Sequence, residues 1–172
     1  FDLVSWSSVG SVRRKYGQTK RMFTSKTMYG WLPIGHMRHH ITKVNQCPGC
    51  RHDDETMEHP FRCTHRSCVT TRTKALKERA SQGRKKKVPR HIMEAVCHVI
   101  RSECAGKKAP LKLTHTPAIK HAIRQQHRIS SHLMLRGFLA TEWCTAMQDS
   151  GVKEPELRMI SLQRLIWDEW VT

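Results

Sequence analysis

The sequence predicts a mainly α-helical chain with one small stapled module, a short hairpin followed by a helix, within a helical domain. Apolar side chains recur at helical spacing in most segments, and no segment shows sustained alternation of apolar and polar residues. One window, between residues 47 and 63, differs from the helical segments because cysteine and histidine cluster in it. A chain of 172 residues suits one domain, or one small core with an attached module.

The chain divides into four parts. Residues 1–17 have little periodicity and are expected to be a mobile lead-in, and residues 18–80 hold the stapled module with its flanking helices. Residues 81–116 are a basic linker with an amphipathic helix, and residues 117–172 are a C-terminal helical region. Because the chain starts with Phe1 rather than Met and ends inside a helical pattern, we expect it to be a fragment of a longer protein.

Helices are expected first over residues 18–30, which Gly30 ends, and over the short basic segment 34–41. A polar helix follows over residues 67–80, and Ser81-Gln82-Gly83 is expected to end it. Residues 91–104 form the most amphipathic segment, and its two cysteines are interpreted as core residues. The buried stripe of that helix is Ile92, Ala95, Val96, Val99 and Ile100.

Four further helices are expected in the last third of the chain, after a basic linker at residues 106–117. They cover residues 117–126, 128–136, 138–148 and 156–172, with prolines in or just before the first and last of them and a break at Gly137. Their expected core residues are Leu133, Leu135, Phe138, Leu139, Trp143, Met147, Leu157, Ile160, Trp167 and Val171.

The cysteine and histidine window follows the pattern C-x2-C-x8-H-x3-C, formed by Cys47, Cys50, His59 and Cys63. Three thiolates and one imidazole are the ligands that a tetrahedral Zn²⁺ site selects. The Pro48-Gly49 pair suits a type II turn between the first two cysteines. The sequence therefore predicts one bound zinc.

The exact ligand set has alternatives. Pro60 pushes the residue before it out of the α region, so His59 is expected to be the last extended residue and Pro60 to open the helix that carries Cys63. Cys68 could replace Cys63, or join it in a set with Cys47 and Cys50. His65 could replace His59, and His52 lies within the loop. A reduced, metal-free cysteine cluster is a further alternative.

Composition bounds the setting and the partners. The odd cysteine count and the metal-type C-x-x-C pair favour a reducing intracellular compartment. The net charge of +17 is uneven: residues 1–46 carry +7 and residues 67–126 carry +12, while the window between them is slightly acidic. No apolar run approaches the roughly 20 residues of a membrane span. The positive charge of residues 1–46 and 67–126 favours the binding of polyanions, although a basic face that is merely solvated is the alternative.

RNA or DNA, contacted mostly through the phosphate backbone, is therefore the expected partner, and no membrane is expected. The run from Arg84 to Arg90 also resembles a nuclear-localisation patch, so a nuclear location is expected. Trp31 could stack on an unpaired base or lie buried under the cysteine loop. The candidate nucleic-acid contacts are Trp31, Arg38, Arg84, Lys85, Lys86, Lys87 and Arg90.

These motifs together resemble the zinc-binding region that follows the polymerase domain in non-LTR retrotransposon reverse transcriptases. The resemblance rests on Trp31-Leu32-Pro33-Ile34-Gly35, then on Cys47-Pro48-Gly49-Cys50, and then on Glu55-Thr56-x-x-His59-x-x-x-Cys63. It is close over residues 28–66 and looser to residue 170. It implies a module that binds zinc and helps to hold template RNA or target DNA. Pro60, where the family usually has an aliphatic residue, is a departure.

The sequence carries no catalytic motif of a polymerase or nuclease, and Asp53-Asp54 resembles a palm motif in letters only. Four protein ligands also leave a zinc ion no open position for water. We therefore expect a segment that is not itself an enzyme, although the resemblance implies a reverse transcriptase as its parent protein. The alternatives are a zinc-stabilised protein–protein interaction module and a decayed retroelement remnant without activity.

Overall fold

The structure, a computed structural model, describes residues 2–32, 34–35, 39, 41 and 43–168 and is mainly helical, as predicted. Within these residues no strand forms, and one isolated bridge pairs Val4 with Ala140. Half of the predicted helix 34–41, and Val171, lie outside the described residues. The helices are α1 (Trp6–Arg14), α2 (Gln18–Tyr29), α4 (His59–Arg62), α5 (Arg66–Lys85), α6 (Arg90–Cys104), α7 (Pro117–Ile129), α8 (Ser131–Leu135), α9 (Glu142–Asp149) and α10 (Pro155–Asp168).

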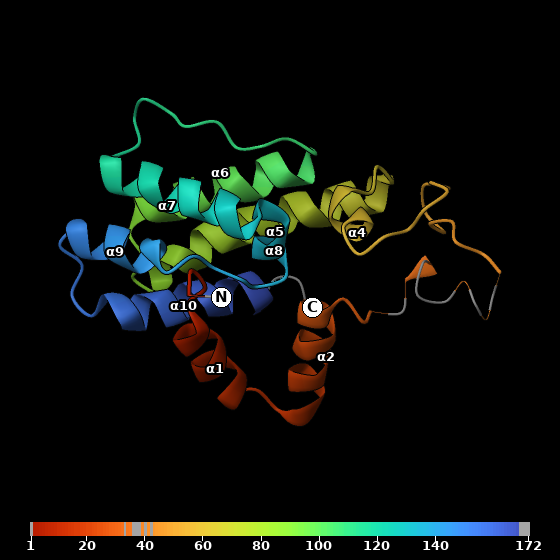
Figure 1. Cartoon of the computed structure of the whole chain (residues 1–172), viewed down its shortest axis with the longest axis horizontal. Helices are drawn as coiled ribbons and strands as arrows, with labels where there is room; N and C mark the ends of the chain where they lie inside the picture. Colours follow the sequence, from red (N-terminus) through yellow and green to blue (C-terminus); the bar gives the residue numbers. More distant parts are fainter. Residues whose placement is uncertain (1, 33, 36–38, 40, 42, 169–172) are drawn as a thin grey trace.

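Helix α6 lies at the centre of the main hydrophobic core, packed against α5, α7 and α8 (Figure 1). The predicted stripe is confirmed, because Ile92, Val96, Val99 and Ile100 are fully buried and Ala95 is almost so. These positions repeat every three to four residues and therefore share one face of the helix. Of the two cysteines interpreted as core, Cys97 is buried, whereas Cys104 is half-buried against the core.

The C-terminal helices surround the buried side-chain amide of Gln126. Its Nε2 donates to the Phe138 carbonyl at 2.9 Å, and its Oε1 accepts from the Ala140 amide at 3.0 Å and from the Trp143 indole at 3.2 Å. A buried amide is tolerated when its groups are paired in this way. Residues 138–140 are consequently not helical, and the predicted helix 138–148 begins only at Glu142. Leu157, predicted to be core, is 41% exposed.

The expected lead-in, residues 1–17, instead contains helix α1, and it packs on α10. Val9 and Val12, three residues apart, bury one face of α1 in a second cluster that includes Trp167. Before the helix, the Ser5 amide donates to the Leu139 carbonyl at 2.9 Å. Apolar contacts distant in sequence thus order a segment whose own periodicity is weak.

Helix α5 runs through Gly83, where the sequence indicated a stop. A methyl group at Gly83 would lie 2.8 Å from the Met93 sulfur, so the missing side chain lets α6 pack closely on α5. Glycine inside a helix costs about 1 kcal/mol relative to alanine. The tertiary contact with Met93 outweighs that local preference.

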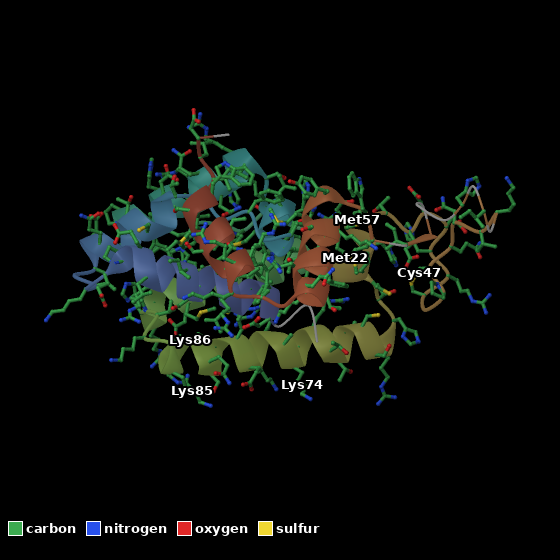
Figure 2. The ribbon with its side chains drawn as sticks, turned by 90° about the horizontal axis from the view of Figure 1, so that it is seen from below. Met22, Cys47, Met57, Lys74, Lys85 and Lys86 are labelled. Carbon is green, nitrogen blue, oxygen red and sulfur yellow. The ribbon has the colours of Figure 1, made fainter. Side chains whose placement is uncertain are left out.

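The segment that carries Cys47 extends from the helical body at one end of the molecule, beyond α4 (Figures 1 and 2). Helix α4 is the point of attachment, because Phe61 on it is buried in the main core. Arg62 forms an ion pair with Glu103 on α6. Helix α4 therefore ties the cysteine segment to the helical body.

Candidate metal centre

The backbone of residues 45–55 forms a compact loop. The Cys47 amide donates to the His52 carbonyl at 2.9 Å, and the Glu55 amide donates to the Asn45 carbonyl at 3.0 Å. The side-chain amides of Asn45 and Gln46 donate to Asp54 and Asp53. The aspartate pair that resembles a palm motif therefore braces this loop.

The predicted type II turn at Pro48-Gly49 does not form. Gly49 lacks a positive φ, and the left-handed residue is Arg51, with φ of 62°. The Arg51 amide donates to the Cys47 carbonyl at 3.0 Å, which closes a turn one residue longer than expected. A methyl group on Gly49 would lie 3.2 Å from the exposed His65 side chain, which would have to shift slightly to make room for it.

The four predicted ligands converge on one point. The ligand atoms of Cys47, Cys50, His59 and Cys63 all lie within 4.8 Å of one another. The Cys47 and Cys63 sulfurs are 3.8 Å apart, and the Cys50 sulfur is 3.2 Å from His59 Nε2. The site is mostly shielded, because Cys47, His59 and Cys63 are buried. These four residues form a possible metal-binding cluster, consistent with zinc.

The separation of the Cys47 and Cys63 sulfurs fits a tetrahedral ion. With Zn–S bonds of about 2.3 Å, two cysteine sulfurs on one tetrahedral zinc lie about 3.8 Å apart. The Cys47–Cys63 separation has this value. A disulfide would need about 2.05 Å, and all the cysteines are unbridged. The donor set and its spacing therefore suit zinc.

The pKa values of the ligands differ for local reasons. A hydrogen bond from the His52 backbone is the main cause of a lowered pKa at Cys50, whereas burial raises the pKa of Cys63 to about 12. Burial, reinforced by the neighbouring His52, lowers the pKa of His59 and so favours the neutral imidazole that metals bind. Metal binding at Cys63 would release its thiol proton.

The start of α4 differs from the prediction. The helix begins at His59 itself, which carries its ring into the site, and it ends at Arg62, so Cys63 follows the helix. The Cys63 amide donates to the His59 carbonyl at 2.6 Å, which keeps both ligands on one turn. Arg72 of α5 donates to the Cys63 carbonyl at 2.7 Å and so holds that ligand from the second helix. The sequence did not single out Arg72.

The alternative ligands lie outside the four-residue cluster. His65 bonds to Ser67 at 2.7 Å, and the exposed His52 ring packs on the His59 ring with centroids 5.0 Å apart. Cys68 is half-buried in the first turn of α5 and lines a neighbouring cavity.

The candidate nucleic-acid contacts lie apart from the cluster. Arg84 and Lys85 end α5, Lys86 and Lys87 form the turn, and Arg90 opens α6. The 20 residues of α5 span roughly 30 Å, so this basic turn and the metal cluster occupy opposite ends of one helix (Figure 2). The structure therefore places the second basic block on one side of the metal cluster, along α5, and the bracketing of the module by two blocks stays a prediction. Arg38 lies outside the described residues.

The exposed side of α5 connects the two ends. It carries the exposed cations Arg66, Lys74 and Lys77, and Figure 2 shows Lys74 and Lys85 pointing away from the body. Sequence reasoning noted the charge of this region but missed these three residues. The helical spacing of Lys74 and Lys77 along the predicted helix 67–80 could have identified these two, whereas Arg66 lies just before that predicted helix.

Trp31 is 65% exposed, so it does not lie buried under the cysteine loop. Gly30, in the left-handed conformation, ends α2, and the Trp31 amide donates back to the Lys26 carbonyl at 2.7 Å. This cap directs the chain outward. The Trp31 ring lies 5.7 Å from the exposed Tyr29 ring, at 39° to it.

The fold and the cluster define a helical protein with a candidate Cys₃His metal centre. No family model, curated protein or solved structure matches the chain. Within the described residues, no helix has both the length and the apolar character needed to cross a membrane.

Proposed function

We propose that this chain is a zinc-dependent nucleic-acid-binding segment of a retroelement polyprotein of the reverse-transcriptase type, and that it is not catalytic by itself. The observation that supports the proposal is the convergence of Cys47, Cys50, His59 and Cys63 at one end of α5, a helix with a cationic exposed side. The resemblance of residues 28–66 to a retrotransposon zinc region adds to it. A nuclear location is part of the proposal.

Zinc would have a structural role in this proposal. Four protein ligands complete a tetrahedral shell and leave no position for a reacting water. The bound zinc would hold the loop and α4 together as the short hairpin-and-helix module expected from the sequence. Of the described residues between Val44 and Glu58, only Cys47 is buried, so the loop has little core of its own. A metal would supply the missing stability.

The cations of α5 and of the turn after it would contact phosphate. Arg66, Lys74, Lys77, Arg84 and Lys85 are all exposed, whereas Glu78 is the only acid on this helix. Glu78 accepts a hydrogen bond from Gln82. Contacts of this kind bind RNA or DNA with little base selectivity, because phosphates are the same at every position.

The salt dependence of binding tests the proposal. The logarithm of the association constant should fall linearly with the logarithm of salt concentration, with a slope near −0.9 per phosphate on duplex DNA or about −0.7 on single strands. Changing Arg84, Lys85, Lys86 and Lys87 to Ala should weaken all sequences alike and make the slope shallower by a few units. A control that removes four exposed charges elsewhere is Lys107, Lys108, Lys112 and Lys153 changed to Ala.

If both variants lose the same affinity for nucleic acid, net charge alone would explain the loss. The α5 surface would then no longer be part of the proposal. Failure to bind any RNA or DNA at about 0.05 M salt would overturn the nucleic-acid function. Zinc dependence is checked in parallel, because removal of the metal with EDTA should abolish binding.

A second candidate function is a zinc-stabilised protein-interaction module. It is favoured by an apolar cavity of about 330 Å³ between α2, α4 and α5, lined by Phe23, Leu32 and Phe61 among others. Met22, Tyr29 and Trp31 are exposed on and just after α2. Loss of all nucleic-acid binding in the test above, with zinc retained, would favour this function.

A further inference from the structure

A second cationic feature lies between α5 and α6, away from the metal cluster. It is a cavity of about 220 Å³ that three arginines border: Arg84 from α5, and Arg90 and Arg101 from the two ends of α6. Its floor is apolar and closed, because Val88, Met93 and Cys97 are each at most 3% exposed. The cavity thus combines a charged rim with a dry base.

The three arginines line the same cavity, and helix geometry explains how they reach it from two helices. Side chains on a helix lean toward its N-terminus, so Arg101 leans back over Cys97, and Arg84 leans back over Ala80. Arg90 is drawn the other way, because its Nε donates to Glu94 at 2.7 Å. Residues 90, 94, 97 and 101 share one face of α6, and all of them line the cavity.

The charges of the cavity are only partly compensated. Glu94 is its only acid and is already paired with Arg90, which lowers the pKa of Glu94 through their hydrogen bond. The side chains of Arg84 and Arg101 form no hydrogen bond or ion pair with any described residue. Burial raises the pKa of the Cys97 thiol, so the floor carries no thiolate at neutral pH. The cavity is left with a surplus of positive charge.

We propose that this arginine pocket binds the terminal phosphate of a nucleic-acid strand. A phosphate monoester is a dianion near neutral pH with three free oxygens, and guanidinium groups bind such oxygens in a bidentate manner. An internal phosphodiester carries one charge and continues in two directions, which a closed floor does not accommodate. Lys85, Lys86 and Lys87 directly follow Arg84, so a strand that ends in the pocket would continue over them.

The inference rests on the proposed function, and its test separates the two. Oligonucleotides of one sequence would carry a 5′-phosphate, a 3′-phosphate or hydroxyl groups at both ends, and their binding to the full chain would be measured at about 0.15 M salt. One phosphorylated end is expected to bind about tenfold more tightly than the hydroxyl form, the gain of one strong charge-assisted contact. The arm with the higher affinity identifies the end that the pocket accepts.

Arg101→Ala should abolish this preference and leave the affinity for the hydroxyl form within about twofold, since Arg101 lies outside the α5 surface. Arg124→Ala, which removes one exposed arginine from α7, should keep the preference. Arg101→Lys keeps the charge but loses bidentate geometry, so it should restore only part of the preference. If Arg101→Ala lowers the melting temperature markedly, Arg101→Gln replaces it.

Equal affinity for all three oligonucleotides would overturn the inference and leave the proposed function intact. So would an equal loss of preference in the Arg101 and Arg124 variants, because charge alone would then explain it. If no oligonucleotide binds, both proposals fail, unless inorganic pyrophosphate binds in titration calorimetry and Arg101→Ala removes that binding. In that case the arginine pocket would bind phosphate groups, but not the end of a nucleic-acid strand.

Discussion

The indole ring of Trp167 lies directly on Gly137, so that a methyl group on Gly137 would come within 2.1 Å of the indole nitrogen. The glycine has a left-handed φ of 94°, and Gln163 donates to its carbonyl at 2.9 Å. Trp167 donates to the neighbouring Arg136 carbonyl at 3.3 Å. This contact joins the turn after α8 to the end of α10.

Gly137→Ala is therefore expected to be severely destabilising. The left-handed conformation costs an alanine about 1–2 kcal/mol, and overpacking against a fixed ring adds about 1–3 kcal/mol. Gly151→Ala is the matched control, because Gly151 also has a positive φ, of 71°, but nothing within 4 Å of the added methyl. Urea unfolding measures both, and equal losses in the two variants would show that the Trp167 contact is not tight.

One zinc ion per chain is expected. Structural zinc contributes on the order of 10–16 kcal/mol in small modules, so Cys47→Ser or Cys63→Ser should release the metal and unfold residues 31–66. Metal analysis and the absorption spectrum after cobalt substitution measure occupancy and ligand type. The control variant, Cys68→Ser with His65→Ala, should keep the metal. Zinc lost from this control would show that the ligand assignment is wrong, and purified protein without zinc would refute the site.

Trp31→Ala should weaken single-strand binding without affecting stability. The ring is 65% exposed, so its removal should hardly change the melting temperature, whereas loss of base stacking should cost about 1–3 kcal/mol of binding free energy. Leu113→Ala is the control, since that side chain is 98% exposed on the linker before α7. A large fall in melting temperature, or unchanged affinity, would contradict a stacking role.

Stability should fall in acid through Asp168. Burial acts to raise its pKa, but hydrogen bonds from Lys20 and Tyr16 outweigh burial, and the pKa is lowered. The carboxylate therefore contributes its full stability above its unfolded pKa of about 3.9, and this contribution is lost as the pH falls through the lower folded value. Asp168→Asn should lose about 1–3 kcal/mol at pH 7.

The pH profile of that variant is the decisive measurement. Its unfolding free energy should depend less on pH below about 4 than that of the unmodified chain. Asp149→Asn, which changes an exposed aspartate, should leave both the stability and the profile unchanged. If the unfolding free energy of Asp168→Asn falls in acid as steeply as that of the unmodified chain, Asp168 is not the cause of the acid sensitivity.

Features determined by local spacing were predictable from the sequence. The stripe of α6 and the convergence of the four cysteine and histidine ligands follow from helical periodicity and from a short loop. Features that depend on distant contacts were not. Helix α5 continues through Gly83 because Met93 packs there, and α1 is ordered by α10, more than a hundred residues later. The cavity that Arg84 and Arg101 border exists only once α5 and α6 pack together.

Helix α4 carries a candidate ligand, His59, and a core residue, Phe61, on a single turn. An ion held by His59 would therefore be coupled to the packing of the whole helical body. By mass action, a free zinc concentration one hundred times the dissociation constant would add about 2.7 kcal/mol to the unfolding free energy. The melting temperature of the protein would then follow the zinc supply of its surroundings, so that metal starvation would act on the fold as a mild denaturant does.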